Sequence, residues 1–177
     1  MMKDPIRKYE LIGISVIFGL GAVMHFAFEW SGELKPIAVF AAVNESVWEH
    51  LKLAYWPTLL YAAIEYRNVR KFSNNFIIAK SAGIYVVPAT IIALFYGYTA
   101  ITESDNLIAD ISIFAAAVAL GQLVSYKILS RQRLTRPLYL TGLVALISLG
   151  VIYAVFTFYP PQLPIFRDAN SGLYGIP

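Results

Sequence analysis

The sequence predicts an all-α fold, an integral membrane helical bundle of about five transmembrane helices plus a short re-entrant or interfacial helix. Of the 177 residues, 58% are apolar and only 14% are charged, and the mean hydropathy is +0.62. Several apolar runs approach the roughly 20 residues that a helix needs to cross a hydrocarbon core of about 30 Å. Together these features indicate a single multi-pass membrane domain, residues 1–177.

Each element follows from the pattern of apolar runs. The expected spans are residues 10–30, 51–66, 76–101, 107–129 and 138–159. The second is the shortest, because its N-terminal turn is polar. Between the first two spans, the apolar run 37–43 is too short to cross and predicts the re-entrant or interfacial helix. Pro36 can open that helix, since proline suits the first helical turn.

Basic residues cluster on one side of the predicted bundle. Five spans place three groups together: Lys3, Arg7 and Lys8; Arg67, Arg70 and Lys71; and Arg131, Arg133 and Arg136. The positive-inside rule makes that side cytoplasmic. We therefore expect a multi-pass cell-membrane protein with residues 1–9 as a cytoplasmic N-terminus and an extracytoplasmic C-terminus. Because topology explains the net charge of +3, the expected partners are the lipid bilayer and further copies of the chain, not nucleic acid.

The densest group of polar side chains is residues 44–52, Asn-Glu-Ser-Val-Trp-Glu-His-Leu-Lys. A charge near the bilayer centre costs about 2.5 to 3.5 kcal/mol on insertion scales, so charged residues in such a chain mark candidate functional sites. Ser46 and Glu49 have the spacing of a capping box, in which the carboxylate reaches back to the cap. This spacing predicts that a helix starts at Ser46.

The end of the first span and the start at Ser46 are expected on the same side of the membrane. His25 and Glu29, four residues apart, share one helix face there. We predict His25, Glu29 and His50 as ligands of zinc or another divalent metal, with Glu45 and Glu49 as catalytic residues, one of them a general base. A thiolate site is excluded, because the chain has no cysteine. The alternatives are that Glu49 only caps the helix and that His25 and Glu29 only bond each other.

Residues 160–177 differ in composition from the spans. Their prolines forbid a helix, while their aromatic and aliphatic residues are too frequent for a typical disordered tail. We expect a non-helical tail that packs on the extracytoplasmic side, over residues 44–52 as a lid. The alternative is a tail lying on the lipid surface.

Three motifs carry a resemblance to a known family. They are His-Phe-Ala-Phe-Glu-Trp at residues 25–30, the polar block at 44–52, and the closing Pro-Pro-x-Leu-Pro-Ile-Phe-x-Asp with Gly-x-Tyr-Gly-Ile. Over most of its length the chain resembles small prokaryotic multi-pass membrane proteins that are catalogued as a domain of unknown function. The resemblance implies no activity, cofactor or catalytic residue.

Three functions are compatible with this pattern. The leading hypothesis is a metal-dependent membrane hydrolase of a lipid or peptide, in which a glutamate activates a metal-bound water. The alternative is a small cation- or proton-coupled transporter or channel, in which protonation of the polar block accompanies opening. The third is a structural or assembly protein, in which the block only fixes the fold.

Overall fold

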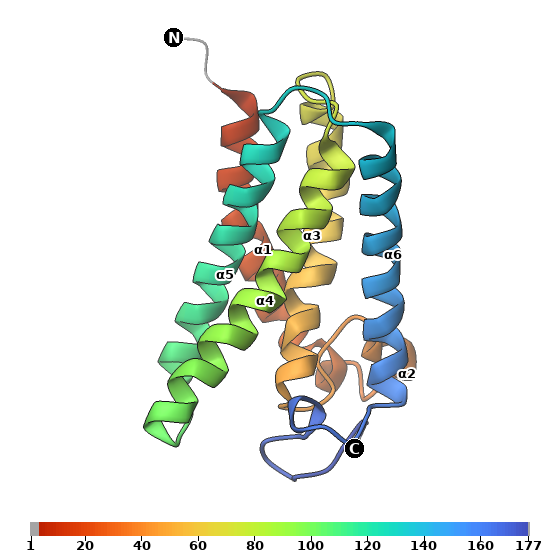
Figure 1. Cartoon of the computed structure of the whole chain (residues 1–177). Coiled ribbons are helices and arrows are strands. Elements are labelled where there is room, and N and C mark those ends of the chain that lie inside the picture. The colour runs from red at the N-terminus through yellow and green to blue at the C-terminus, as the bar shows by residue number, and fades with distance from the viewer. Residues whose placement is uncertain (1–3, 177) are drawn as a thin grey trace.

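The computed structural model describes residues 4–176, and their arrangement confirms the predicted all-α fold (Figure 1). The described residues contain no strand, only an isolated bridge between Arg167 and Tyr174. The elements are α1 (Pro5–Trp30), α2 (Lys35–Ala38), α3 (Val47–Val69), α4 (Phe76–Thr102), α5 (Leu107–Leu129), α6 (Arg136–Phe158) and the 3-10 helix η1 (Pro164–Phe166).

Four of the five predicted spans are long and apolar enough to cross a membrane. They are α1, α4, α5 and Leu138–Phe158 within α6. The described residues thus contain four candidate spans by length and composition, where about five were predicted. Helix α3 packs against α1, α4 and α6, but charged residues lower its hydropathy: Glu49, Lys52, Glu65 and Arg67. Three of these charges, Glu49, Lys52 and Glu65, are buried inside the bundle, whereas Arg67 is exposed near the end of the helix.

The outer faces of the long helices are apolar. Large aliphatic side chains there are more than half exposed: Val23, Leu60, Ile64, Val144, Ile147 and Val151. Soluble monomers rarely expose so much contiguous apolar surface, whereas hydrocarbon is a favourable surrounding for it. The interior is filled by a cluster that includes Ile17, Leu51, Tyr55, Ile84 and Tyr153. The distribution of side chains thus matches a bundle embedded in lipid.

The two ends of the bundle differ in chemistry. The start of α1 and the α3–α4 and α5–α6 loops lie at one end, while α2, the start of α3 and the C-terminal tail lie at the other (Figure 1). The described basic clusters therefore share one end, and Lys3 lies outside the described residues. That this end is cytoplasmic stays a prediction. The segment expected as the N-terminus, residues 1–9, is helical from Pro5, where Asp4 caps α1 by accepting from the Arg7 N–H at 3.2 Å.

Helices α4 and α5 cross closely at a pair of glycines. A Cβ atom on Gly83 would lie only 2.8 Å from the carbonyl oxygen of Gly121. Small residues at such crossings let membrane helices approach. We expect Gly83→Leu to lower the free energy of unfolding by about 1 to 3 kcal/mol through overpacking, measured by thermal unfolding in detergent. Gly97→Leu is the matched control, since nothing lies within 4 Å of a Cβ there; equal stability of both variants would contradict the close crossing.

Candidate metal centre

The start of α3 is fixed by side chains on both sides of it. Ser46 caps the helix, as predicted, and its Oγ accepts from the Glu49 N–H at 3.3 Å. The second half of the predicted capping box is replaced: the Glu49 carboxylate accepts from the Val43 N–H at 3.1 Å, and the Ser46 N–H donates to Asn44 Oδ1 at 2.9 Å. Helix α2 spans only Lys35–Ala38, shorter than the predicted 37–43. Residues 39–46 are therefore a loop held by polar contacts.

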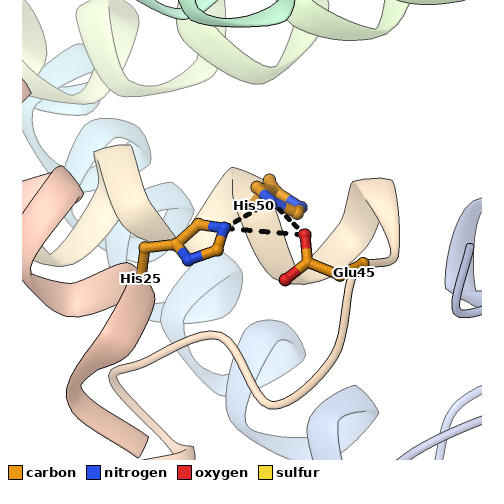
Figure 2. A group of neighbouring side chains, drawn as sticks. All are labelled: His25, Glu45 and His50. Carbon is orange, nitrogen blue, oxygen red and sulfur yellow. Dashed lines mark hydrogen bonds and ion pairs between the residues drawn. The ribbon is translucent and has the colours of Figure 1, made fainter. Parts of the chain in front are cut away.

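Three side chains from separate segments converge beside this loop. His25 comes from α1, Glu45 from the loop and His50 from the first turn of α3 (Figure 2). The Nε2 atoms of His25 and His50 are 3.0 Å apart, and Glu45 Oε2 lies 3.6 Å from the first and 3.3 Å from the second. The side chains of His25, His50 and Glu45 are 26%, 32% and 42% exposed. The cluster is thus preorganised and still reachable from outside.

The hydrogen bonds set which histidine atom faces the cluster. His50 Nδ1 lies 2.8 Å from the carbonyl oxygen of Ser46. Because a carbonyl only accepts, Nδ1 carries a proton and donates it to Ser46, which leaves Nε2 facing Glu45 and His25. Without a metal, a proton on Nε2 is donated to the Glu45 carboxylate, and a metal ion would take the place of that proton. This arrangement, in which the ring nitrogen away from the site is held by a backbone carbonyl, is typical of metal-ligating histidine.

The separations of the three atoms fit a shared metal ion. Tetrahedral zinc with bonds of about 2.0 to 2.1 Å places its ligand atoms about 3.3 to 3.4 Å from one another. The observed separations in the His25–Glu45–His50 cluster lie on both sides of that value. Two imidazoles and one carboxylate are also the ligand set of a known class of catalytic zinc sites, which keep a fourth position for water or substrate. The residues present therefore fit the ion in number, type and spacing.

The electrostatics favour the ligand form of Glu45. Hydrogen bonds with His25 and then His50 hold the pKa of this carboxyl well below its usual range, against an opposing contribution from burial. Glu45 is therefore an anion throughout the physiological range, as a metal ligand must be.

The pH dependence of metal binding should follow the histidines alone. Protons compete with the metal for imidazole nitrogen, whose unperturbed pKa is about 6.5. Burial opposes protonation of His50, but hydrogen bonds with Glu45 and with the Ser46 carbonyl outweigh it and raise its pKa. We therefore expect zinc affinity to begin falling above that ordinary value as the pH drops, because protonated histidine cannot ligate. Zinc titrations across pH measure this. Affinity that rises on acidification would contradict imidazole ligation.

The C-terminal tail lies against the same loop. Asp168 Oδ1 accepts from the Glu45 N–H at 2.8 Å, and Asn44 Nδ2 donates to the Gly175 carbonyl at 2.8 Å. The ring of Phe166, in η1, lies 4.7 Å from that of Trp48. Burial opposes ionisation of Asp168, but hydrogen bonds from Ser171 outweigh it and lower its pKa. An ionised tail residue thus holds the backbone of the candidate ligand Glu45.

We expect Asp168→Ala to weaken zinc binding by about 10-fold or more, a loss typical when a partner that orients a ligand is removed. The Glu45 N–H would lose its acceptor, and the loop would hold the carboxylate less well. Zinc titration of the full chain measures the change, with Asp105→Asn, an exposed acidic residue in the α4–α5 loop, as the control. Unchanged affinity would show that the tail does not position Glu45.

The other two predicted site residues, Glu29 and Glu49, are not part of the three-residue cluster. Glu29 is exposed and lines a cavity of about 250 Å³ together with His25, Glu33 and Glu45, but it is not one of the three converging side chains. Glu49 is buried, with Oε2 at 2.6 Å from Lys52 Nζ, and its other oxygen accepts from the Thr157 hydroxyl at 3.1 Å. The structure therefore separates Glu49 from the histidines and places it in an internal ion pair.

A second buried polar network was missed from the sequence. Lys80, from α4, lies between Glu10 and Glu65 inside the bundle. Both glutamates fall within apolar runs, and an ionisable residue in such a run is the signal that should have identified them. Their partner could not be inferred, because the three residues come from different helices.

The fold and this site together define a class: a helical protein with four membrane-length apolar helices and a histidine–carboxylate cluster at one end of its bundle. The chain belongs to the family of unknown function DUF6512, whose model matches residues 1–176. No curated protein and no solved structure matches the chain.

Proposed function

We propose that this protein is a metal-dependent membrane hydrolase whose zinc, or another divalent ion, is held by His25, His50 and Glu45. The observation that carries the proposal is the convergence of two imidazole nitrogens and one carboxylate oxygen at separations of 3.0, 3.3 and 3.6 Å. Hydrogen bonding alone does not require three such atoms to meet at tetrahedral ligand spacing, whereas a shared ion does.

The residue roles differ from those expected from the sequence. Glu45 takes the place of Glu29 as the carboxylate ligand, because the loop before α3 directs it at the histidines. Glu29 is left as the candidate general base: it is exposed and lines the cavity beside His25 and Glu45. A divalent ion at such a site lowers the pKa of bound water and polarises a substrate carbonyl. Glu29 would then accept the proton that the attacking water releases.

The surroundings of the cluster favour a lipid over a peptide as substrate. Phe26 and Trp30, on the last turns of α1, are exposed and stack with ring centroids 5.6 Å apart. Aromatic residues at the end of an apolar span occupy the headgroup level of the bilayer. The cavity beside them carries Glu29, Glu33 and Glu45, so a headgroup without net negative charge suits it best. The proposed substrate class is a neutral or cationic lipid with an ester or amide bond.

The test is turnover by the full chain loaded with zinc. Fluorogenic ester and amide lipids, and a peptide substrate, are presented in mixed micelles. We expect hydrolysis of a lipid, and we expect Glu29→Gln to lower kcat by about 100-fold or more, the usual contribution of a general base, while zinc content stays unchanged. Glu103→Gln, an exposed residue after α4, is the control. Zinc-loaded protein that cleaves none of these substrates would contradict the hydrolase but leave the metal site standing.

The transporter alternative stays a prediction. No contact among the described residues supports it over the hydrolase. It needs a polar path through the bundle, and between the two ends the described interior is occupied by the apolar and aromatic cluster around Leu51, Tyr55 and Tyr153. Ion or proton flux in proteoliposomes would support it. The structural or assembly role would gain support if variants of the cluster changed stability without changing metal content.

A further inference from the structure

The second buried network joins three helices through one lysine. Lys80, from α4, has its Nζ atom 2.8 Å from Glu10 Oε1, on α1, and 2.5 Å from Glu65 Oε2, on α3. Ser125, from α5, donates its hydroxyl to the same Glu10 oxygen at 2.6 Å. The exposures of Glu10, Lys80 and Glu65 are 2%, 3% and 0%. The network is closed off from the surface of the bundle.

This network is separate from the candidate metal centre. His50 and Glu65 are 15 residues apart on α3, which corresponds to about 22 Å along a helix. Glu65 lies in the last turns of α3 and Lys80 in the first turns of α4, so the network sits just inside the end of the bundle that carries the basic clusters. Any role it has is therefore independent of zinc.

The charges of the network do not balance when every group is ionised. Two carboxylates face one ammonium group, which leaves one uncompensated negative charge. The other side chains that face it are neutral: the Tyr61 hydroxyl donates to the Tyr9 carbonyl, Ser125 to Glu10, and Gln122 Nε2 to the Glu10 carbonyl. The apolar ring of Phe76 lies beside Lys80, with its centroid 5.5 Å from Nζ. No second described cation approaches either carboxylate.

The carboxylates also lack enough hydrogen-bond donors. Glu10 Oε2 and both oxygens of Glu65 are buried without a hydrogen-bond partner, although Oε2 of Glu65 is ion-paired with Lys80. A buried carboxylate without enough donors is strongly unfavourable, and such a group takes up a proton instead. Two carboxyl groups that share one site readily bind one proton between them, since the negative charge of the first opposes ionisation of the second. The two ion-paired oxygens both contact Lys80 Nζ, so they are close enough for this effect.

We propose that Glu10, Glu65 and Lys80 form a proton-binding site that holds one proton on its two carboxyl groups. Proton uptake converts one carboxylate to a carboxylic acid, and the other stays paired with the ammonium group, so the network is neutral. The proton supplies the missing donor for one of the unpartnered oxygens. The nearer end of the bundle, which bears the basic clusters, is the side with which the site exchanges its proton.

Infrared spectroscopy of the full chain tests this directly. The protein is measured in maltoside micelles, which have no carbonyl groups of their own, in H₂O and in D₂O at neutral pH. We expect the wild-type chain to show a protonated-carboxyl C=O band that shifts in D₂O. Glu65→Gln and Glu10→Gln should each lose this band, because the remaining carboxylate pairs one to one with Lys80. Lys80→Met should instead increase it about twofold, because both carboxyl groups are then protonated.

Asp110→Asn is the control, since Asp110 is the carboxylate that accepts from Tyr98, at 2.6 Å, in a different part of the bundle; its substitution should leave the band unchanged. Wild-type protein without such a band would overturn the proposal, and this result requires no variant to fold. A band that survives both Glu10→Gln and Glu65→Gln, or that disappears in Asp110→Asn, would also overturn it.

Discussion

Replacing either histidine with alanine is expected to lower the affinity for zinc by more than about 100-fold. This exceeds the loss typical of removing a residue that only hydrogen-bonds to a metal ligand. His25 and His50 each supply one of three converging ligand atoms, and the remaining pair cannot complete a tetrahedral site. Zinc titration of metal-free full chain, with elemental analysis of the purified protein, measures the effect. Both variants should remain folded, because the two side chains are partly exposed and outside the packed core.

Asp105→Asn is the matched control for this experiment, because it removes an exposed acidic group from the α4–α5 loop, which lies at the same end of the bundle (Figure 1). It should bind zinc as the wild-type chain does. Glu45→Gln should lose affinity like the histidine variants, whereas Glu29→Gln should not. A His25→Ala or His50→Ala variant with wild-type zinc affinity would show that the cluster is a hydrogen-bonded group and not a metal site.

The largest effect on stability is expected for Lys52→Met. Lys52 is fully buried, and its Nζ atom binds Glu49 Oε2 at 2.6 Å, the Ala38 carbonyl at 2.8 Å and the Thr157 hydroxyl at 2.7 Å. The ammonium group thereby ties α2 and α6 to the start of α3. Its removal leaves the Glu49 carboxylate buried without a counter-charge, which typically costs about 3 to 5 kcal/mol. Reversible unfolding in mixed micelles measures this loss.

The double variant Lys52→Met and Glu49→Gln separates charge from packing. It removes both charges, so it should recover part of the lost stability. Lys35→Met, at an exposed lysine of α2, should change stability by less than about 0.5 kcal/mol. If the single Lys52→Met variant were as stable as the wild-type chain, the buried ion pair would not be holding this end of the bundle together.

The positions of the helices could be predicted from the sequence, but the polar contacts around α3 could not. The apolar runs determined four membrane-length helices to within a few residues, because length and hydropathy act locally. Helix α3 was expected to be a fifth apolar span, yet its charged residues keep it out of the four apolar candidates. Its charges are tolerated because Lys80 and Thr157, from other helices, pair with Glu65 and Glu49. Pairing between distant segments leaves no pattern in a single sequence.

The candidate site was predictable in part for the same reason. Chain direction placed the end of α1 and the start of α3 together, so His25 and His50 were correctly expected at one end. The choice among glutamates depended on a loop. The Glu49 carboxylate turns inward to Val43 and Lys52, and Asp168 of the tail holds the backbone of Glu45. Helix spacing favoured Glu29 and Glu49, while these loop contacts direct Glu45 at the histidines.

X-ray absorption at the zinc edge, on the full wild-type chain loaded with one equivalent of zinc, tests the metal centre most directly. The predicted spectrum is that of a four-coordinate ion with two imidazole nitrogens and carboxylate or water oxygens at about 2.0 to 2.2 Å. His50→Ala should lose one imidazole from that shell. A chain that retains no zinc, or a zinc shell without imidazole, would contradict the assignment of His25, Glu45 and His50 as a metal centre.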